Sequence, residues 1–332
     1  MGSKCWMKLM RNRFLNERGA ELSAPRQDLT GREGFYMNAF KKQIPLQLML
    51  LPGLIALALF CYYPMCGIVL AFKEYIPSKG IWDSPWVGLQ HFSFMFTYTQ
   101  TWRAIQNTVI ISLLKIVITF PIPIIFSLML NEVYNKFVKR TIQTAVYLPY
   151  FVSWVILGGI FIDLLSKNGI INQALVFVGL SQLDFLSDNR YFRSVLIVTE
   201  IWKNCGYGTV VYLAALTGID PTLYEAAYVD GAGKWKQTIY VTIPSIMPIV
   251  AMMAVLSLGN ILNAGFDQIY ILSNPTVYET ADIIDTLVYR LTVQSPDFGL
   301  ATAVGLLKSA VTCIFMMSGY FILYKTSDYR IF

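Results

Sequence analysis

Ionisable and amide side chains inside long apolar runs are the first candidates for chemistry in this 332-residue sequence. A charged group in hydrocarbon is costly, so each such residue is a functional candidate by default. These apolar runs contain three lysines and one glutamate, and this excess of positive charge would suit an anionic solute. We predict a solute pathway lined by Lys115, Glu200, Lys203, Asn204, Asn260, Asn263 and Lys308, with Asn107 as a further buried amide.

A structural explanation for the same charges stays open. Glu200 and Lys203 lie three residues apart and could pair on one helix face. Lys115 and Lys308 could instead extend their ammonium groups toward the membrane surface. Aromatic faces that could hold a sugar ring are also present, although aromatic residues in membrane spans more often serve packing. They are Trp154, Trp202, Tyr207 and Tyr212.

The remaining reactive residue types do not form a catalytic or metal-binding pattern. His91 is the single histidine, and the five cysteines show neither a CxxC pair nor zinc spacing. No apolar run contains two acids. Gly233-Lys234 resembles the end of a phosphate loop, but Tyr228 and Trp235 occupy the positions that require glycine and Ser or Thr. We therefore expect no catalytic residue, no metal and no cofactor in this chain.

Composition indicates that the chain spans a membrane. Hydrophobic residues make up 55% of it, charged residues only 14%, and the mean hydropathy is +0.52. An apolar run of about 20 residues crosses the hydrocarbon core as a helix. We predict an all-α membrane protein with kinks at Pro64, Pro121 and Pro123 and a close helix contact at Gly158-Gly159. The six expected transmembrane helices cover about 46–72, 105–130, 142–165, 194–216, 246–262 and 302–324.

The distribution of lysine and arginine predicts the orientation of this six-span domain, residues 46–324. Nine of them lie in the basic N-terminal segment 1–45, three in loop 131–141, two in loop 217–245 and two in the tail 325–332, against seven in the longer loops opposite. Positive charge favours the cytoplasmic side, so both termini are expected there. This bias also explains the net charge of +6, and we expect lipid rather than nucleic acid as a partner.

Loop 217–245 carries the most specific local signals. Asp220 is a good N-cap and Pro221 suits the first helical position, which predicts a short helix from Pro221 to Val229. Gly231 and Gly233 would permit a sharp turn, after which an amphipathic stretch runs from Lys234 until Pro244 opens the fifth span. A helix–turn–helix with small central residues and an exposed carboxylate is typical of a docking knob.

Three blocks in this loop, Glu225-Ala226-Ala227, Gly231-Ala232 and Val241-Thr242-Ile243-Pro244, resemble the signature of permease subunits of bacterial ABC importers. In the last block, Val and Ile replace Ile and Leu. The resemblance implies that the loop is a coupling helix that docks into a groove on a separate ATPase subunit, which binds the ATP and Mg²⁺. It implies coupling roles for Glu225, Ala226, Ala227, Asp230, Gly231, Gly233 and Pro244.

Further blocks resemble the polysaccharide branch of MalF-like carbohydrate permeases, which includes alginate and pectin-fragment importers. These blocks are Tyr147-Leu148-Pro149-Tyr150, Phe266-Asp267-Gln268-Ile269-Tyr270, Asn274-Pro275 and Glu279-Thr280-Ala281-Asp282, together with the Asp328-Tyr329-Arg330 tail. The resemblance implies a type I importer architecture in the bacterial inner membrane and alternating access for an oligosaccharide, an acidic one included.

The partners implied by this resemblance are a second permease, with a heterodimer favoured, two ATPase copies and an extracytoplasmic solute-binding protein. The alternative is a secondary transporter or a channel for a polar solute. A secondary transporter would need no ATPase and commonly shows internal repeats, and the sequence contains no clear repeat.

Overall fold

The computed structural model describes residues 47–259 and 262–326, so the predicted basic segment 1–45 lies outside the described part. Contacts divide the chain into two compact units, Met1–Cys66 and Gly67–Phe332. In the first unit, residues 47–57 are α-helical and continue as a π-helix, η1 (Ala58–Tyr62). A 3₁₀-helix, η2 (Tyr63–Phe72), follows. The α-helix thus ends at Leu57 and the π-helix at Tyr62. Pro64 follows in the 3₁₀-helix, and its missing N–H cannot donate to an α-helical ladder.

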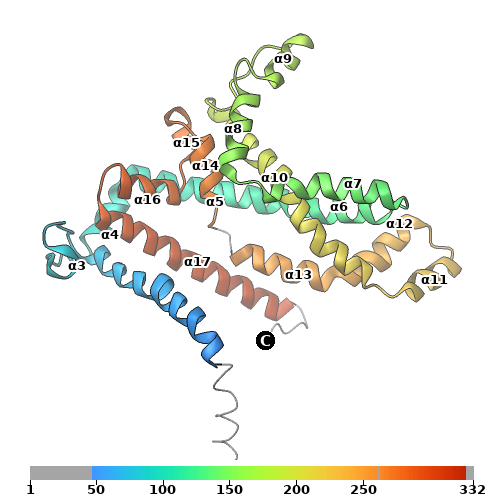
Figure 1. Ribbon diagram of the computed structural model, residues 1–332, viewed down its shortest axis with the longest axis horizontal. Coiled ribbons are helices and arrows are strands. Elements are labelled where there is room, and N and C mark those ends of the chain that lie inside the picture. The colour runs from blue at the N-terminus through green and yellow to red at the C-terminus, as the bar shows by residue number, and fades with distance from the viewer. Residues whose placement is uncertain (1–46, 260–261, 327–332) are drawn as a thin grey trace, which may run out of the picture. The chain divides into compact units, whose positions relative to one another are not determined.

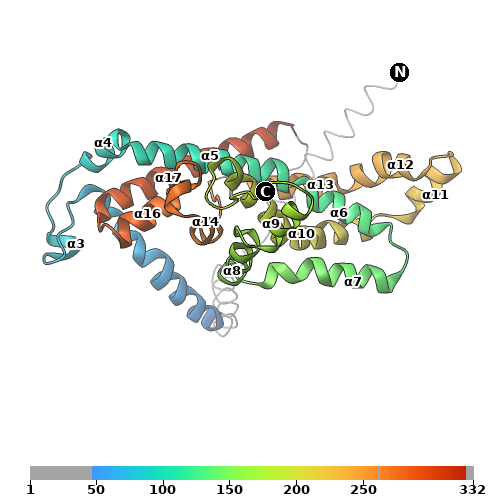
Figure 2. The same ribbon diagram turned by 90° about the horizontal axis from the view of Figure 1, so that it is seen from above.

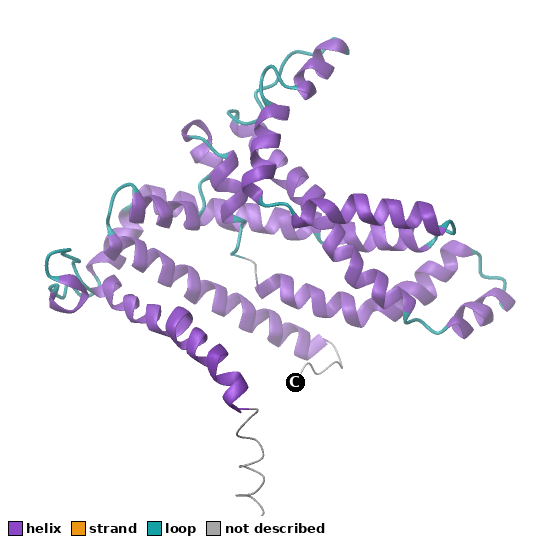
Figure 3. Ribbon diagram, in the orientation of Figure 1, coloured by secondary structure: helices purple, strands orange, loops and turns teal. Residues whose placement is uncertain are grey.

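The described residues are almost entirely helical and contain no named strand (Figure 3). Within the described ranges, five segments are long and apolar enough to cross a membrane: Gln47–Phe72, Thr99–Asn131, Trp154–Phe177, Lys234–Ser257 and Phe298–Ser318. The expected fourth span lies inside the 29-residue helix α10 (Asn189–Thr217), which also carries Arg190, Arg193, Glu200 and Lys203. At 1.5 Å per residue a helix of this length can cross the bilayer. The all-α membrane fold is confirmed.

The second predicted span is interrupted where its prolines stand. It consists of α5 (Thr99–Thr119) and α6 (Pro121–Asn131), with a break at Phe120. Pro121 cannot donate the hydrogen bond that would continue α5. The hydrogen-bond ladder is therefore interrupted at Pro121, while Phe120 keeps helical dihedral angles, φ −64° and ψ −43°.

The third predicted span, 142–165, is not one continuous helix. The structure has α7 (Lys136–Tyr147), the 3₁₀-helix η3 (Leu148–Phe151), α8 (Trp154–Leu165) and α9 (Ile170–Phe177). Lys203 of α10 donates from Nζ to the carbonyl oxygens of Pro149 at 3.4 Å and Tyr150 at 3.2 Å, and also to that of Val152. A buried lysine thus satisfies the carbonyls that the broken helix exposes, and α8 leaves at a steep angle to α7 (Figure 1).

The helix α10 organises the larger unit. It packs against α5, α6, α7 and α13, and α6, α7 and α10 all extend toward the end of this unit that carries α11 and α12 (Figures 1 and 2). Its Phe192 and Leu196 lie in an apolar core with Ile111 of α5 and Ile269. At Gly158-Gly159, where a neighbouring backbone was expected to come close, the near neighbour is a side chain and only Gly158 meets it: a Cβ there would lie 2.3 Å from the side chain of Ile271.

Replacing Gly206 by alanine is expected to loosen the packing of α10 on α7. A Cβ at Gly206 would lie 2.3 Å from the carbonyl oxygen of Val146, which is backbone and cannot rotate away. Forced overpacking of this kind costs about 1–3 kcal/mol, measurable as a lower unfolding temperature of the purified protein. The matched control is Gly159→Ala in α8, where a Cβ meets nothing within 4 Å. Equal stability of the two variants would contradict this packing.

The loop predicted at 217–245 forms α11 (Pro221–Val229), α12 (Lys234–Gln237) and a π-helix, η4 (Thr238–Thr242), which leads into α13 (Ile243–Gly259). The bounds of α11 agree with the prediction. The fifth span, however, does not open at Pro244, because one helix runs from Lys234 through Ser257. A π-turn commonly occurs where the regular pattern of α-helical hydrogen bonds is interrupted. Here η4 ends two residues before Pro244, which has no N–H to donate.

The opposite end of the larger unit is a folded layer of short helices. It contains α3 (Gly80–Asp83), α4 (Gln90–Thr97), α14 (Phe266–Leu272), η5 (Pro275–Val277), α15 (Tyr278–Ala281), α16 (Ile284–Val293) and the start of α17 (Phe298–Thr326). Arg290 donates to both carboxylate oxygens of Asp282 at 2.7 and 2.5 Å. This pairing raises the pKa of Arg290 and fixes α16 on the turn that precedes it.

Candidate functional site

A buried charge cluster joins α5, α10 and α14. The Lys115 ammonium donates to Glu200 Oε2 at 3.0 Å, to Gln268 Oε1 at 2.5 Å and to the carbonyl oxygen of Ala264 at 2.7 Å. Lys115 is 7% exposed, and these three acceptors use all three of its donors. Gln268 in turn donates to the Leu196 carbonyl and to Thr199 Oγ1, each at 2.7 Å. The Lys115 charge is therefore neutralised and fully hydrogen-bonded within the chain.

The four predicted charges pair differently from the structural alternative considered above. Glu200 pairs with Lys115 rather than with Lys203. Lys308 donates to both oxygens of the Asp285 carboxylate on α16, at 2.6 and 2.7 Å. Lys203 contacts backbone carbonyls and lies 5.5 Å from the Trp154 ring centroid. Among the described residues, Lys203 is the lysine of this set that pairs with no carboxylate.

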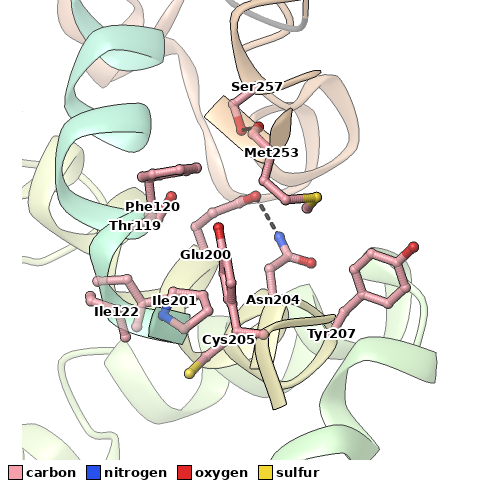
Figure 4. Close-up of a pocket in the computed structure, with 13 residues that line it drawn as sticks. Thr119, Phe120, Ile122, Glu200, Ile201, Asn204, Cys205, Tyr207, Met253 and Ser257 are labelled. Atoms are coloured by element: carbon pink, nitrogen blue, oxygen red, sulfur yellow. Dashed lines mark hydrogen bonds between the residues drawn. The ribbon is translucent and has the colours of Figure 1, made fainter. Parts of the chain in front are cut away.

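A hollow with mostly apolar walls and a few polar groups, called the polar hollow below, opens beside this cluster. Asn204 donates to Glu200 Oε1 at 2.6 Å, and Ser257 and Met253 of α13 lie across from them (Figure 4). A second hollow shares Glu200 and Ser257 and is lined also by Lys115 and Asn263. Of the residues predicted for the pathway, Glu200 thus lines both hollows, Asn204 the first, and Asn263 and Lys115 the second.

Lys203 and Lys308 line neither hollow, and Asn260 lies outside the described residues. The sequence prediction also missed Thr119 and Ser257, which line both hollows. A hydroxyl within an apolar run was the available signal for them. That signal is weak, because serine and threonine in membrane helices usually satisfy their hydroxyl on a nearby backbone carbonyl, as Thr119 does on Lys115.

The four aromatic candidates separate into two groups. Tyr207 and Tyr212 line the first hollow, and the Tyr207 ring stacks on Tyr150 with centroids 4.6 Å apart and an interplanar angle of 10°. Trp202 instead packs edge-on against Phe161, and Trp154 lies against Lys203. Tyr207 is therefore the aromatic face best placed to meet a solute, while both tryptophans serve packing.

The docking knob predicted in loop 217–245 consists of α11, α12 and the turn between them. Its first helix, α11, begins and ends with the expected caps. The Thr222 amide donates to Asp220 Oδ1 at 2.9 Å, and this hydrogen bond lowers the pKa of the Asp220 carboxyl. Gly231 has φ +75°, a conformation that favours glycine. Gly233 has φ −68°, which any residue adopts, so of the two glycines only Gly231 takes a conformation that favours glycine.

The knob exposes a mixed polar and apolar surface. Glu225, Ala226 and Asp230 are exposed, and Val229 and Trp235 expose 84% and 81% of their surface. Large apolar side chains at such exposure, rimmed by polar residues, are typical of a protein-contact surface. Pro244 lies apart from this surface, inside the long helix that includes α13.

The described residues contain no group of three His, Cys, Asp or Glu residues that could hold a metal. What they contain is a bundle of membrane-length helices, a polar hollow within it and an exposed knob at one end. These features define the chain as a membrane transport permease. The chain belongs to the family described as the binding-protein-dependent transport system inner membrane component, whose profile matches residues 119–327.

Curated relatives and solved structures agree with this family. The chain is 42% identical over 273 residues to the polygalacturonan/rhamnogalacturonan transport system permease protein YteP of Bacillus subtilis (strain 168), covering 82% of this chain and 85% of YteP. It is 38% identical over 306 residues to Protein LplB of the same organism, covering 92% and 96%.

A crystal structure of a bacterial ABC transporter involved in the import of the acidic polysaccharide alginate superposes with a TM-score of 0.82 at 39% identity, covering 88% of this chain and 99% of that chain. The resemblance to MalF-like ABC permeases is confirmed, and so is the type I architecture. The chain is a permease rather than an enzyme, and no comparison favours a secondary transporter or a channel.

Proposed function

We propose that this chain is one of two permease subunits of an ABC importer that moves an acidic oligosaccharide across the bacterial inner membrane. The observation that carries the proposal is the similarity over nearly the whole chain to an alginate ABC transporter. A second structure of that transporter is in complex with an alginate pentasaccharide-bound periplasmic protein. We infer the same kinds of partner here: a different second permease, two ATPase subunits that bind ATP and Mg²⁺, and an external solute-binding protein.

The orientation that we propose puts the knob in the cytoplasm together with both termini. Lysine and arginine concentrate on that side of the predicted topology. The exposed surface around Glu225 and Trp235 would then face the ATPase, and the layer formed by α3, α4, α15 and α16 would face the solute-binding protein. ATP binding would bring the two ATPases together, and the knob would transmit that motion to the helices.

The polar hollow supports passage of a saccharide. Glu200, Asn204 and Ser257 offer hydrogen-bonding groups, and the stacked Tyr207 ring offers a flat apolar face. Small-molecule sites combine such faces with a few polar groups. Lys203 contacts the carbonyl of Tyr150, the residue on which Tyr207 stacks. Lys203 lines neither hollow, but its positive charge beside the stacked Tyr150 and Tyr207 rings would favour an anionic sugar there.

Acidic oligosaccharides are expected to stimulate ATP hydrolysis by the purified complex several-fold over its basal rate. The complex would contain both permeases, the ATPases and the solute-binding protein. The probes are oligogalacturonate and alginate oligosaccharides, and the matched controls are the same chains with their carboxyl groups reduced to alcohols. Equal stimulation by both forms would contradict acidic selectivity, and no stimulation by any saccharide would contradict the proposed substrate class.

A further inference from the structure

Three side chains connect the knob to the helix that follows it. The Tyr224 hydroxyl of α11 lies 3.0 Å from Thr242 Oγ1, which in turn lies 3.3 Å from the carbonyl oxygen of Gln237. Because a threonine hydroxyl has one proton, a chain in which Tyr224 donates to Thr242 and Thr242 donates to Gln237 satisfies all three groups. Gln237 also donates from Nε2 to the Ala232 carbonyl at 2.9 Å. Thr242 and Gln237 are both buried.

The π-turn makes this connection possible. Thr242 donates to a carbonyl five residues earlier, whereas in a regular α-helix a threonine reaches back three or four residues. The Ile243 amide likewise donates to the Thr238 carbonyl, five residues back. The wider turn thus brings the Gln237 carbonyl within reach of the Thr242 hydroxyl, which also lies within hydrogen-bond distance of Tyr224 on α11.

Elsewhere α11 and α13 are separated by a groove. It is lined by Gly218, Asp220 and Leu223 on one side and by Ser245 and Ile249 of α13 on the other, with residues of the α10 end at its base. The polar chain through Tyr224 therefore bridges two elements that this groove keeps apart. Met253 and Ser257 of the same α13 line the polar hollow. The N-terminal end of α13, called its foot below, and one wall of the hollow are therefore parts of one helix.

We propose that Tyr224, Thr242 and Gln237 form a coupling strut, which fixes α11 to the foot of α13 so that displacement of the docked knob moves the wall of the hollow. The three are positioning residues that touch neither nucleotide nor solute. The inference rests on the proposed coupling role of the knob. It adds the route by which displacement of the knob would reach the membrane helices. That route runs through the π-turn into α13 rather than through Gly218 into α10.

Uptake per ATP hydrolysed is the measurement that isolates the strut. The complete importer, with its ATPases and solute-binding protein, would be reconstituted in vesicles, and solute uptake and ATP hydrolysis would be followed in the same sample. Tyr224→Phe and Thr242→Val each remove one hydroxyl with little change in shape. We expect each to lower uptake per ATP by about three- to tenfold, the scale of one buried hydrogen bond, with hydrolysis and complex assembly retained.

The matched control is Tyr240→Phe, which removes the hydroxyl of a tyrosine in the same π-turn that is 75% exposed; it should leave uptake per ATP at the wild-type value. The double variant should lose no more than either single variant, because both act on one bond. Wild-type uptake per ATP in both single variants would overturn the strut, as would a parallel loss of uptake and hydrolysis. Failure of the wild-type complex to take up saccharide would instead count against the proposed function.

Discussion

Replacing Glu225 by lysine is expected to abolish most solute uptake while the chain still inserts and still assembles with its second permease. Glu225 is exposed on α11 beside Ala226, so the change disturbs no interior packing. At a docked contact, charge reversal costs several kcal/mol, which corresponds to a loss on the order of 100-fold in ATPase affinity or coupling. Copurification of the ATPase and uptake into vesicles would measure the two effects.

The companion variant Glu225→Gln keeps the size of the side chain and removes only its charge. It should give an intermediate loss, because it removes the favourable contact without creating repulsion. A graded series from Glu to Gln to Lys is the signature of an electrostatic docking role. Normal uptake in the lysine variant would exclude Glu225 from the coupling contact.

Replacing Lys115 by methionine is expected to destabilise the chain by about 3–5 kcal/mol, because removing one partner of a buried ion pair leaves the other uncompensated. Glu200 would lose its counter-charge, and Gln268 Oε1 and the Ala264 carbonyl would lose their donor. The unfolding transition of the purified complex would report the change. Uptake should fall with the amount of folded protein.

The double variant Lys115→Met with Glu200→Gln should recover part of the stability, since it removes the stranded carboxylate. The matched single control is Lys308→Met, whose partner Asp285 is more exposed than Glu200 and should cost less. A Lys115→Met protein with unchanged stability but weaker response to acidic saccharides would contradict the structural role and favour direct contact with the solute.

These pairings change the argument for an acidic substrate. Three lysines in apolar runs indicated a cationic path, but Lys115 and Lys308 are each neutralised by a carboxylate. Of these three lysines, Lys203 forms no ion pair with a carboxylate of the described residues, and backbone carbonyls hold its ammonium group in place. The similarity to an alginate importer therefore now carries more of the argument than the count of lysines does.

Local signals in the sequence predicted the elements that depend on local physics. Asp220 and Pro221 define the start of α11, and Gly231 its end, because caps and a left-handed glycine act within one turn. Pro121 ends α5 for an equally local reason. The six apolar runs, the family signature around Glu225 and the absence of a phosphate-loop pattern likewise needed no knowledge of distant contacts.

The tertiary structure alone decided how the buried charges pair. In the mostly apolar stretch 142–165, Pro149 gives a local reason for the helix to end at Tyr147, but only the packed structure brings Lys203 of another helix to the carbonyls that this break exposes. Lys115 finds Glu200 and Gln268 across long sequence separations. Hydrophobicity and capping act between neighbours in the chain, whereas a buried charge is paired by whichever group the packed helices bring within about 3 Å. For that reason the sequence by itself determined the class of protein and its knob, and only the packed bundle determined which polar residues line the hollows.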